Sequence, residues 1–374
     1  MKAVGVYIHY PFCIKKCPYC DFTSFVYSKN EEERYIEYIT KEIQLKAKSE
    51  IVDTIYFGGG TPSLMSLKAL DSIFESIYKH YKVKKDLEIT IEVNPGTIDK
   101  EKLSFWKDIG INRISVGVQS FIDEELLILG RIHTVSDTLK TFILLREYGF
   151  DNINLDLIYS IPFQNPNNFY KSLDFALSLN PEHISIYNLI IEEGTLFYEK
   201  YIKGEFTLPD NDVEANMFMY AMNLLEEVGF IHYEISNFAR NINLKCRHNL
   251  KYWNQEEYHG YGVSAYSFAN HIRYGNYKNL FVYYEKINND ELPIENIEIL
   301  NDETYPKDYL FVKLRLMEGV SEKEFFERFG KNISDYIPNL SIFMKEGLIK
   351  RKKDRICLTK KGVLLANEIF RDIL

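Results

Sequence analysis

The stretch Cys13-Ile14-Lys15-Lys16-Cys17-Pro18-Tyr19-Cys20 brings three thiols within eight residues, a density that no other part of the chain matches. A structural zinc site takes four protein ligands, and no second Cys or His pair follows at a matching spacing. Three thiolates instead suit a [4Fe-4S] cluster whose fourth iron is open to an exchangeable ligand. A disulfide is disfavoured because three is an odd number and two lysines make the loop polar. The stretch therefore predicts a cluster site.

Length and composition are those of an ordinary globular protein. The chain has 374 residues, enough for one large domain and a smaller one, with 46% hydrophobic and 26% charged residues. It begins directly with a strand pattern, without a secretion signal, and no stretch approaches the length of a membrane span. We therefore expect a cytoplasmic protein, in which Cys246 and Cys357 are unpaired thiols. The net charge of −9 argues against a general nucleic-acid binder.

Six strand patterns alternate with helical patterns in the first half of the chain, at 4–10, 54–57, 87–93, 113–118, 152–159 and 183–189. Such βα units form parallel strands with right-handed crossovers, so the sheet is either doubly wound or a partial TIM-type barrel. The cysteine loop ends the first strand and the glycine run 58–62 ends the second. Glu92 and Gln119 end the next two strands, and Asp156 lies in the fifth. Functional groups gather at the carboxyl ends of barrel strands, so the sequence predicts one shared mouth.

The second half of the chain has a different pattern. An amphipathic helix at 212–228 precedes a strand from His232, the segment 246–253 and a glycine- and aromatic-rich stretch from Gly260. The acidic, polar interval 288–306 is typical of a linker. Helices at 309–317, 321–329 and 337–346, a basic hairpin and a last helix after Thr359 then resemble a winged-helix domain. We expect domains at 1–200, 201–300 and 301–374, the last with a packing or partner-binding role.

Several long motifs in order resemble the oxygen-independent coproporphyrinogen III oxidase family of radical S-adenosylmethionine (SAM) enzymes. They are YIHYPFC and CDF within 7–22, FGGGTPS at 57–63, IEVNP at 91–95, VGVQSF at 116–121, LGRIH at 129–133, NLDLIYSIP at 154–162 and HNLKYW at 248–253. The likeness covers nearly the whole chain. It implies an α/β fold, a partial (β/α)6 TIM-type radical SAM barrel with a carboxy-terminal α+β region and a winged-helix-like domain.

The resemblance also assigns roles to individual residues. It implies that the cluster ligands are Cys13, Cys17 and Cys20. Matches to SAM-binding positions are Tyr7, Gly59, Gly60, Thr61 and Glu92, and matches to contacts of a second SAM are Gln119, Arg131 and Asp156. Glycines at a strand end also have a physical use, because they let the backbone approach a zwitterionic ligand closely. For Arg131 and Asp156, a buried structural ion pair is the alternative.

Two departures from the oxidase pattern decide the subfamily. Phe22 stands where the oxidase has a further cysteine, and only twelve residues precede the cluster motif. The segment HNLKYW, of the form HNxxYW, instead resembles the HemW subfamily of heme chaperones. That likeness implies that His248 would ligate heme iron while Tyr252 and Trp253 pack against the porphyrin. The alternative is a hydrogen-bonded structural histidine beside two core aromatics.

Three functions follow from these patterns. The first is a heme chaperone that carries a [4Fe-4S] cluster and SAM, passes heme to acceptor proteins, respiratory ones among them, and draws electrons from a flavodoxin or ferredoxin. The second is a radical SAM enzyme that acts on a porphyrin, although we expect no coproporphyrinogen oxidase activity. The third, a cluster-sensing DNA-binding regulator, is disfavoured by the net acidity. The sequence leaves open the iron ligand, covalent attachment, SAM cleavage and the acceptor.

Overall fold

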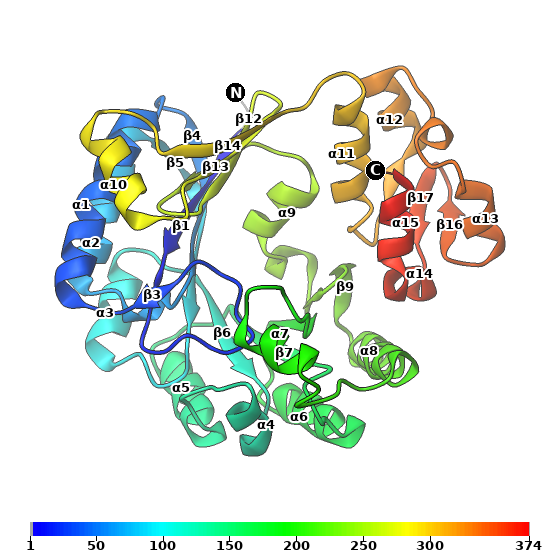
Figure 1. Ribbon diagram of the computed structural model, residues 1–374, viewed down its shortest axis with the longest axis horizontal. Helices are drawn as coiled ribbons and strands as arrows, with labels where there is room; N and C mark the ends of the chain where they lie inside the picture. Colours follow the sequence, from blue (N-terminus) through cyan, green and yellow to red (C-terminus); the bar gives the residue numbers. More distant parts are fainter. Residues whose placement is uncertain (1–2, 374) are drawn as a thin grey trace.

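A computed structural model describes residues 3–373. In this part of the chain, twelve strands form one mixed sheet in the order β14-β13-β12-β11-β1-β4-β5-β6-β7-β8-β10-β9, which curves into an open barrel (Figure 1). The six central strands are β1 (Val4–Tyr10), β4 (Ile51–Gly59), β5 (Lys82–Val93), β6 (Arg113–Gln119), β7 (Ile153–Tyr159) and β8 (His183–Asn188). All neighbours among them pair in parallel, which confirms the predicted βα order.

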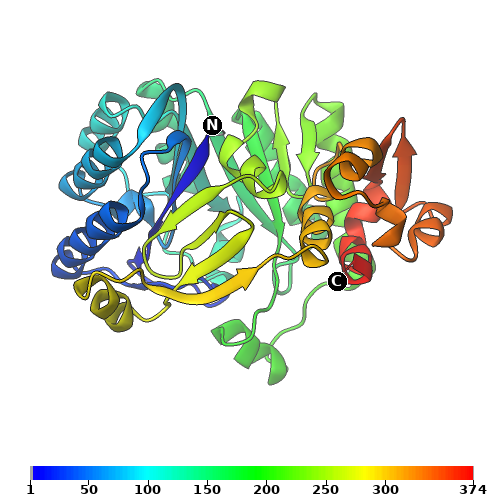
Figure 2. The same cartoon turned by 90° about the horizontal axis from the view of Figure 1, so that it is seen from above.

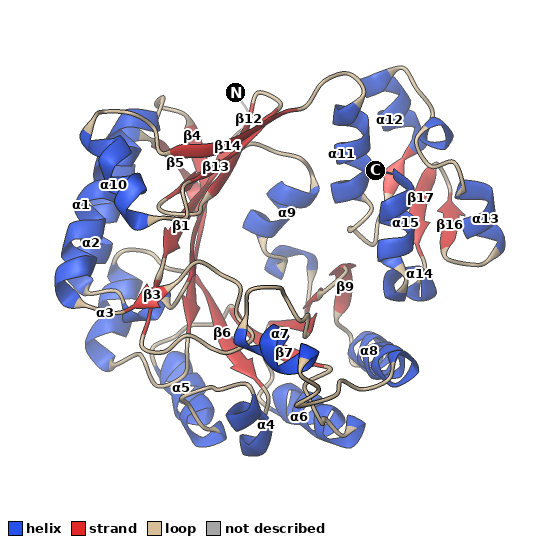
Figure 3. Cartoon of the chain, in the orientation of Figure 1, coloured by secondary structure: helices blue, strands red, loops and turns tan. Residues whose placement is uncertain are grey.

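Helices cover the outer face of these strands (Figure 3). They are α1 (Lys29–Lys46), α2 (Leu67–His80), α3 (Lys100–Asp108), α4 (Asp123–Ile128), α5 (Val135–Glu147), α6 (Pro166–Ser178) and α8 (Asn211–Glu227). The central strands are rich in buried β-branched and aliphatic residues, as expected for a parallel sheet that is covered by side chains on both faces. The partial (β/α)6 barrel predicted from the sequence is therefore confirmed.

The sheet continues beyond both edges of the predicted barrel. Beside β1 lies β11 (Tyr258–Tyr261), which runs parallel to it, followed by the antiparallel strands β12 (Tyr266–Ala269), β13 (Ile272–Asn276) and β14 (Ile294–Ile299). Beside β8 lies β10 (Asn237–Ala239), which runs antiparallel to it, and β10 in turn pairs in antiparallel fashion with β9 (Ile231–Glu234) at the edge. The prediction of a linker at 288–306 is therefore wrong for β14. An edge strand has a partner on one side only, so it keeps acidic, polar side chains in water while its backbone pairs with β13.

Shorter elements connect these layers. They are β2 (Phe12–Cys13), β3 (Phe25–Val26), α7 (Leu196–Ile202), α9 (Arg247–Trp253) and α10 (Leu280–Asn288), with 3-10 turns at Pro62–Leu64, Ile242–Leu244 and Ile333–Asp335. Helix α9 lies on the concave side of the sheet, between the barrel and the carboxy-terminal domain (Figure 1). No helix among the described residues is long and apolar enough to cross a bilayer.

The carboxy-terminal domain lies beside the barrel (Figure 2). It contains α11 (Thr304–Lys313), β15 (Val320–Ser321), α12 (Glu322–Phe329), α13 (Leu340–Lys345), β16 (Ile349–Lys352), β17 (Arg355–Leu358), α14 (Lys360–Leu364) and α15 (Ala366–Ile373). The predicted basic hairpin is present as β16 and β17, and β15 completes a small sheet. Helix α11 begins and ends earlier than the predicted 309–317. Pro306 lies in its first turn, where the missing N–H costs no hydrogen bond.

Candidate functional site

The cysteine loop leaves the carboxyl end of β1 and is closed by a short parallel pair of strands, β2 and β3. Backbone hydrogen bonds from Phe25 to Pro11 (2.7 Å) and from Tyr27 to Cys13 (2.8 Å) tie its two ends together. Within the loop, the amide of Cys20 donates to the carbonyl of Cys17 over 3.2 Å. The three loop thiols are free and half-buried, so they face a common space without being sealed in the core.

That space is a cavity of about 490 Å³ at the carboxyl ends of the barrel strands. Ten of the eleven residues predicted to hold the cluster or SAM line it: Cys13, Cys17, Cys20, Gly59, Gly60, Thr61, Glu92, Gln119, Arg131 and Asp156. Tyr7 is the exception, because it lines a second cavity. Asn94, Ser115, Tyr187 and Asn188 also line the first cavity, and the sequence reasoning missed them. A usable signal existed for Asn94, which follows Glu92 closely at the same strand end.

The surroundings of the thiols fit an iron-sulfur cluster. Thr61 Oγ1 donates to Cys13 Sγ over 3.4 Å, and Arg131 Nη1 donates to Cys17 Sγ over 3.6 Å, so donors already face two sulfurs. Burial raises the pKa of Cys20 to about 11, so metal binding would displace its proton. No three His, Cys, Asp or Glu side chains in residues 3–373 lie close enough to hold one metal ion. In a [4Fe-4S] cluster each thiolate binds a different iron, which requires a wider spacing than a single zinc ion.

The glycine run is joined to the cysteine loop by close backbone approach. Gly59 has φ of +112°, and a Cβ there would lie 2.7 Å from the His9 ring. A Cβ on Gly60 would lie 2.9 Å from the backbone of Phe12. The amides of Gly60 and Thr61 donate to the carbonyls of Tyr10 (2.7 Å) and Phe12 (2.9 Å). Side chains at these two glycines would therefore separate the cluster loop from the cavity wall.

Two carboxyl groups lie in the cavity wall. Glu92 accepts from the Tyr56 hydroxyl (2.9 Å) and the Gly59 amide (3.2 Å), and Asp156 accepts from Ser115 (3.0 Å) and Asn154 (2.8 Å). Burial, followed by the charge of Asp156, raises the pKa of Glu92 to about 7. Burial also raises the pKa of Asp156. A cationic ligand group in the cavity would stabilise both carboxylates.

Arg131 and Gln119 complete the wall. Arg131 Nη2 donates to Asn94 Oδ1 (2.6 Å) and to the Gly117 carbonyl (3.2 Å), not to Asp156, so the alternative of a buried ion pair between Arg131 and Asp156 is wrong for the described chain. The sequence could not show that the side-chain amide of Asn94, and not the carboxylate of Asp156, is the partner of Arg131. Gln119 has φ of +67° at the irregular end of β6, a strained backbone of the kind that is concentrated at functional sites.

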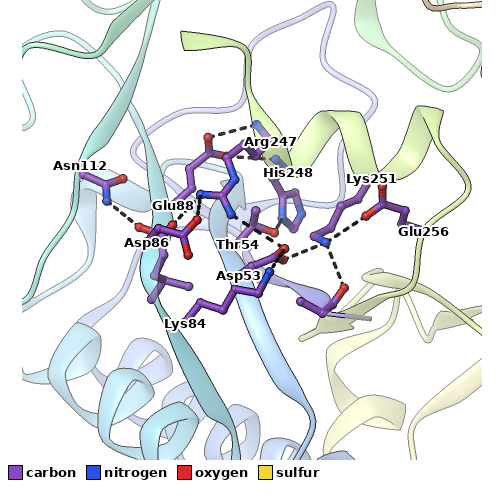
Figure 4. Close-up of polar contacts among 12 residues, drawn as sticks. Asp53, Thr54, Lys84, Asp86, Glu88, Asn112, Arg247, His248, Lys251 and Glu256 are labelled. Atoms are coloured by element: carbon purple, nitrogen blue, oxygen red, sulfur yellow. Dashed lines mark hydrogen bonds and ion pairs between the residues drawn. The ribbon is translucent and has the colours of Figure 1, made fainter. Parts of the chain in front are cut away.

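The HNLKYW segment lies in α9, and polar contacts hold this helix against the first half of β4 and the middle of β5 (Figure 4). The Glu88 carboxylate accepts from the backbone amides of Arg247 (3.0 Å) and His248 (3.0 Å) at the start of the helix. The Lys251 ammonium pairs with Asp53 at 2.8 Å. These charged partners, which the sequence reasoning missed, hold α9 against the concave side of the sheet.

His248 lies in the middle of this contact and is 0% exposed. Its Nδ1 bonds to Thr54 Oγ1 (2.8 Å) and its Nε2 to the Tyr252 hydroxyl (2.8 Å). Burial and then the Lys251 ammonium lower its pKa to about 3, so the ring is neutral. Its ring centroid lies 5.3 Å from that of Tyr56, the residue that bonds to Glu92. His248 thus supports the floor of the first cavity, and it would have to break one of its two bonds to ligate iron.

The second cavity has a volume of about 560 Å³ and lies between β1, the sheet extension and α11. Tyr252 and Trp253 line it, whereas His248 does not. Asp21 and Phe22, which follow the last cysteine of the cluster loop, line both cavities. The three residues of the predicted heme site are therefore divided between the floor of one cavity and the wall of another.

Comparison with known proteins gives the family. The model of the radical SAM superfamily matches residues 7–176, and that of the HemN C-terminal domain matches residues 300–365. A Bacillus subtilis protein named heme chaperone HemW is 37% identical over 371 residues, which cover 98% of each chain. A Lactococcus lactis protein of the same name is 33% identical and covers 100% of this chain and 98% of its own. The chain belongs to the HemW family.

A solved structure shares the fold of this HemW family member. Coproporphyrinogen III oxidase (HemN) from Escherichia coli, described as a radical SAM enzyme, superimposes with a TM-score of 0.86 at 23% identity, over 99% of this chain and 90% of its own. Membership of the radical SAM superfamily implies a [4Fe-4S] cluster and SAM. The three thiols and the adjoining cavity with its two carboxyl groups fit both groups.

Proposed function

We propose that the protein binds heme and passes it to acceptor proteins, and that it carries a [4Fe-4S] cluster and SAM. The observation that carries this proposal is the similarity to proteins named heme chaperone HemW, which extends over 98% of the chain at 37% identity. Phe22 supports it, because this position, a cysteine in the oxidase pattern, is an exposed phenylalanine between the two cavities.

In this proposal Cys13, Cys17 and Cys20 would hold three irons and leave the fourth open to a ligand in the first cavity. Bound there, SAM and a reduced cluster supply radical chemistry to members of this superfamily. Glu92 would accept from the ligand's ammonium group, which favours the ionised carboxylate. Gly59 and Gly60 let the cluster loop approach the cavity wall closely, and Thr61 orients the Cys13 sulfur.

Four of the predicted SAM contacts are either contacts of a second SAM or lie outside the first cavity. Gln119, Arg131 and Asp156 form the far wall, where a second SAM would meet them. Tyr7 bonds to His9 over 3.2 Å, so its place beside SAM is a proposal that depends on a movement of its ring. We further propose that His248 acts on heme through Tyr252, to which it is bonded.

The remaining partners follow from the same chemistry. A cluster that must be reduced needs an electron donor, for which a flavodoxin or a ferredoxin is suitable, and we propose respiratory heme proteins as acceptors. A cluster of this kind persists in a reducing compartment, so we propose the cytoplasm as the location.

Two measurements on anaerobically reconstituted protein test the function. We expect hemin to bind with a shifted Soret band and to pass to an apo-hemoprotein. We expect no protoporphyrinogen when SAM, a reductant and coproporphyrinogen III are supplied. Sustained decarboxylation without hemin uptake would place the protein among the oxidases instead.

A further inference from the structure

The lining of the second cavity is richer in aromatic side chains than that of the first. Its walls carry the aromatic side chains of Phe22, Tyr252, Trp253, Tyr258, Tyr266 and Phe268. Phe22 is 61% exposed and Tyr266 is 44% exposed, although both are large and largely apolar. Exposed apolar side chains around a hollow are typical of a ligand site, because a bound apolar molecule would remove them from water.

We propose that this second cavity is the heme site, and that the first cavity, beside the cluster, holds SAM alone. This inference rests on the proposed function and adds the place where the macrocycle binds. A volume of about 560 Å³ is within the usual range of small-molecule sites. Flat aromatic rings stack on the faces of a porphyrin, and each such contact stabilises the complex beyond simple burial.

Within the described chain, the cavity lining offers one unpaired cation to a carboxylate of heme, and Asp21 adds a carboxylate of its own to the lining. Lys278 is exposed at the cavity, and it forms no ion pair with any residue in 3–373. Arg273 is already paired with Glu298 (2.8 Å) and Asp308 (2.7 Å). Lys278 is therefore the cation that is available to a propionate, while the aromatic walls hold the ring.

The segment between the two cavities decides whether heme and SAM can bind at the same time. Asp21 and Phe22 line both cavities, so this short segment separates them. A macrocycle in the second cavity would lie beside the cluster loop without entering the space next to the thiols. Heme and SAM are therefore expected to bind at the same time, whereas heme in the first cavity would compete with SAM.

The test is a titration of the cluster-loaded protein with hemin, with and without saturating SAM. We expect the hemin dissociation constant to be unchanged by SAM. Tyr266→Ser should raise it about tenfold through lost stacking and burial, and Lys278→Glu about threefold through charge reversal at the rim. The two substitutions should weaken the binding of metal-free protoporphyrin IX in the same order, because this binding depends on ring stacking and propionate contacts and not on the iron.

Matched controls come from an exposed helix on the far side of the barrel. Tyr78, which is 45% exposed, and Lys68 both lie on α2 and line neither cavity, so Tyr78→Ser and Lys68→Glu should leave hemin binding within about twofold of wild type. All four variants should bind SAM normally. Displacement of hemin by SAM, or wild-type affinity in both Tyr266→Ser and Lys278→Glu, would refute the second cavity and leave the chaperone function standing. Failure of the wild-type protein to bind hemin would refute the proposed function itself.

Discussion

Replacement of Glu92 by glutamine should separate the stability of the protein from its binding of SAM. Glu92 is held in the cavity wall by Tyr56 and by the Gly59 amide. Burial and the nearby Asp156 raise its pKa from an ordinary 4.5 to about 7. In the SAM-free protein, ionisation of Glu92 therefore opposes folding. Glutamine keeps the shape and an accepting oxygen without the charge.

The sign and size follow from the two pKa values. Below pH 4.5 the carboxyl is neutral in both states, so Glu92 costs nothing there. As the pH rises from 4.5 towards 7, only the unfolded state releases its proton readily, and folding stability falls. The full loss corresponds to about 3 kcal/mol, and to about 2 kcal/mol when water in the open cavity screens the charge. Glu92→Gln should be more stable than wild type by about that amount at pH 8 and by less than about 1 kcal/mol at pH 5.

Urea unfolding of the SAM-free protein between pH 5 and pH 8 measures this difference. Glu101→Gln is the control, because Glu101 is exposed on α3 and lines neither cavity. Calorimetry should show that Glu92→Gln loses SAM affinity, and that SAM binding to the wild type releases a proton near pH 7. If the urea midpoint of Glu92→Gln differed from that of wild type by the same amount at every pH from 5 to 8, the reasoning would be refuted.

Three further results are expected. Cys17→Ser should lose the brown cluster chromophore and most of its iron, whereas Cys357→Ser, in the carboxy-terminal domain, should keep both; equal iron contents would contradict the ligand assignment. Gly59→Ala should weaken SAM binding at least tenfold, because φ of +112° and the nearby imidazole leave no room for a Cβ; calorimetry on the loaded protein checks this. Thr54→Val should destabilise the fold by about 1–3 kcal/mol, since it leaves His248 Nδ1 buried without a partner. An unchanged urea midpoint would show that the contact between α9 and β4 does not stabilise the fold.

Local patterns were enough for the parts of this protein that are encoded in short windows of sequence. The six parallel strands, the helices between them and the cysteine loop each depend on the periodicity or spacing of residues that are close in the chain. The shared mouth was also predictable, because parallel βα units place every carboxyl strand end on the same side of a barrel. The cysteine loop, the glycine run, Glu92, Gln119 and Asp156 accordingly meet in one cavity, together with Arg131, which only the family resemblance assigned.

Other features depend on partners that are far apart in the chain. His248 is separated from Thr54 by 194 positions, and no local pattern shows that both of its ring nitrogens are already bonded. The edge strand β14 has the composition of a linker, and only its pairing with β13 makes it part of the sheet. The second cavity is formed by residues from β1, the cluster loop, α9, the sheet extension and α11. The sequence by itself thus determined the cluster loop and the barrel, because each segment carries its own signal. Only the tertiary structure decided the role of α9 and the existence of a second cavity, because both arise from contacts between surfaces that no single segment contains.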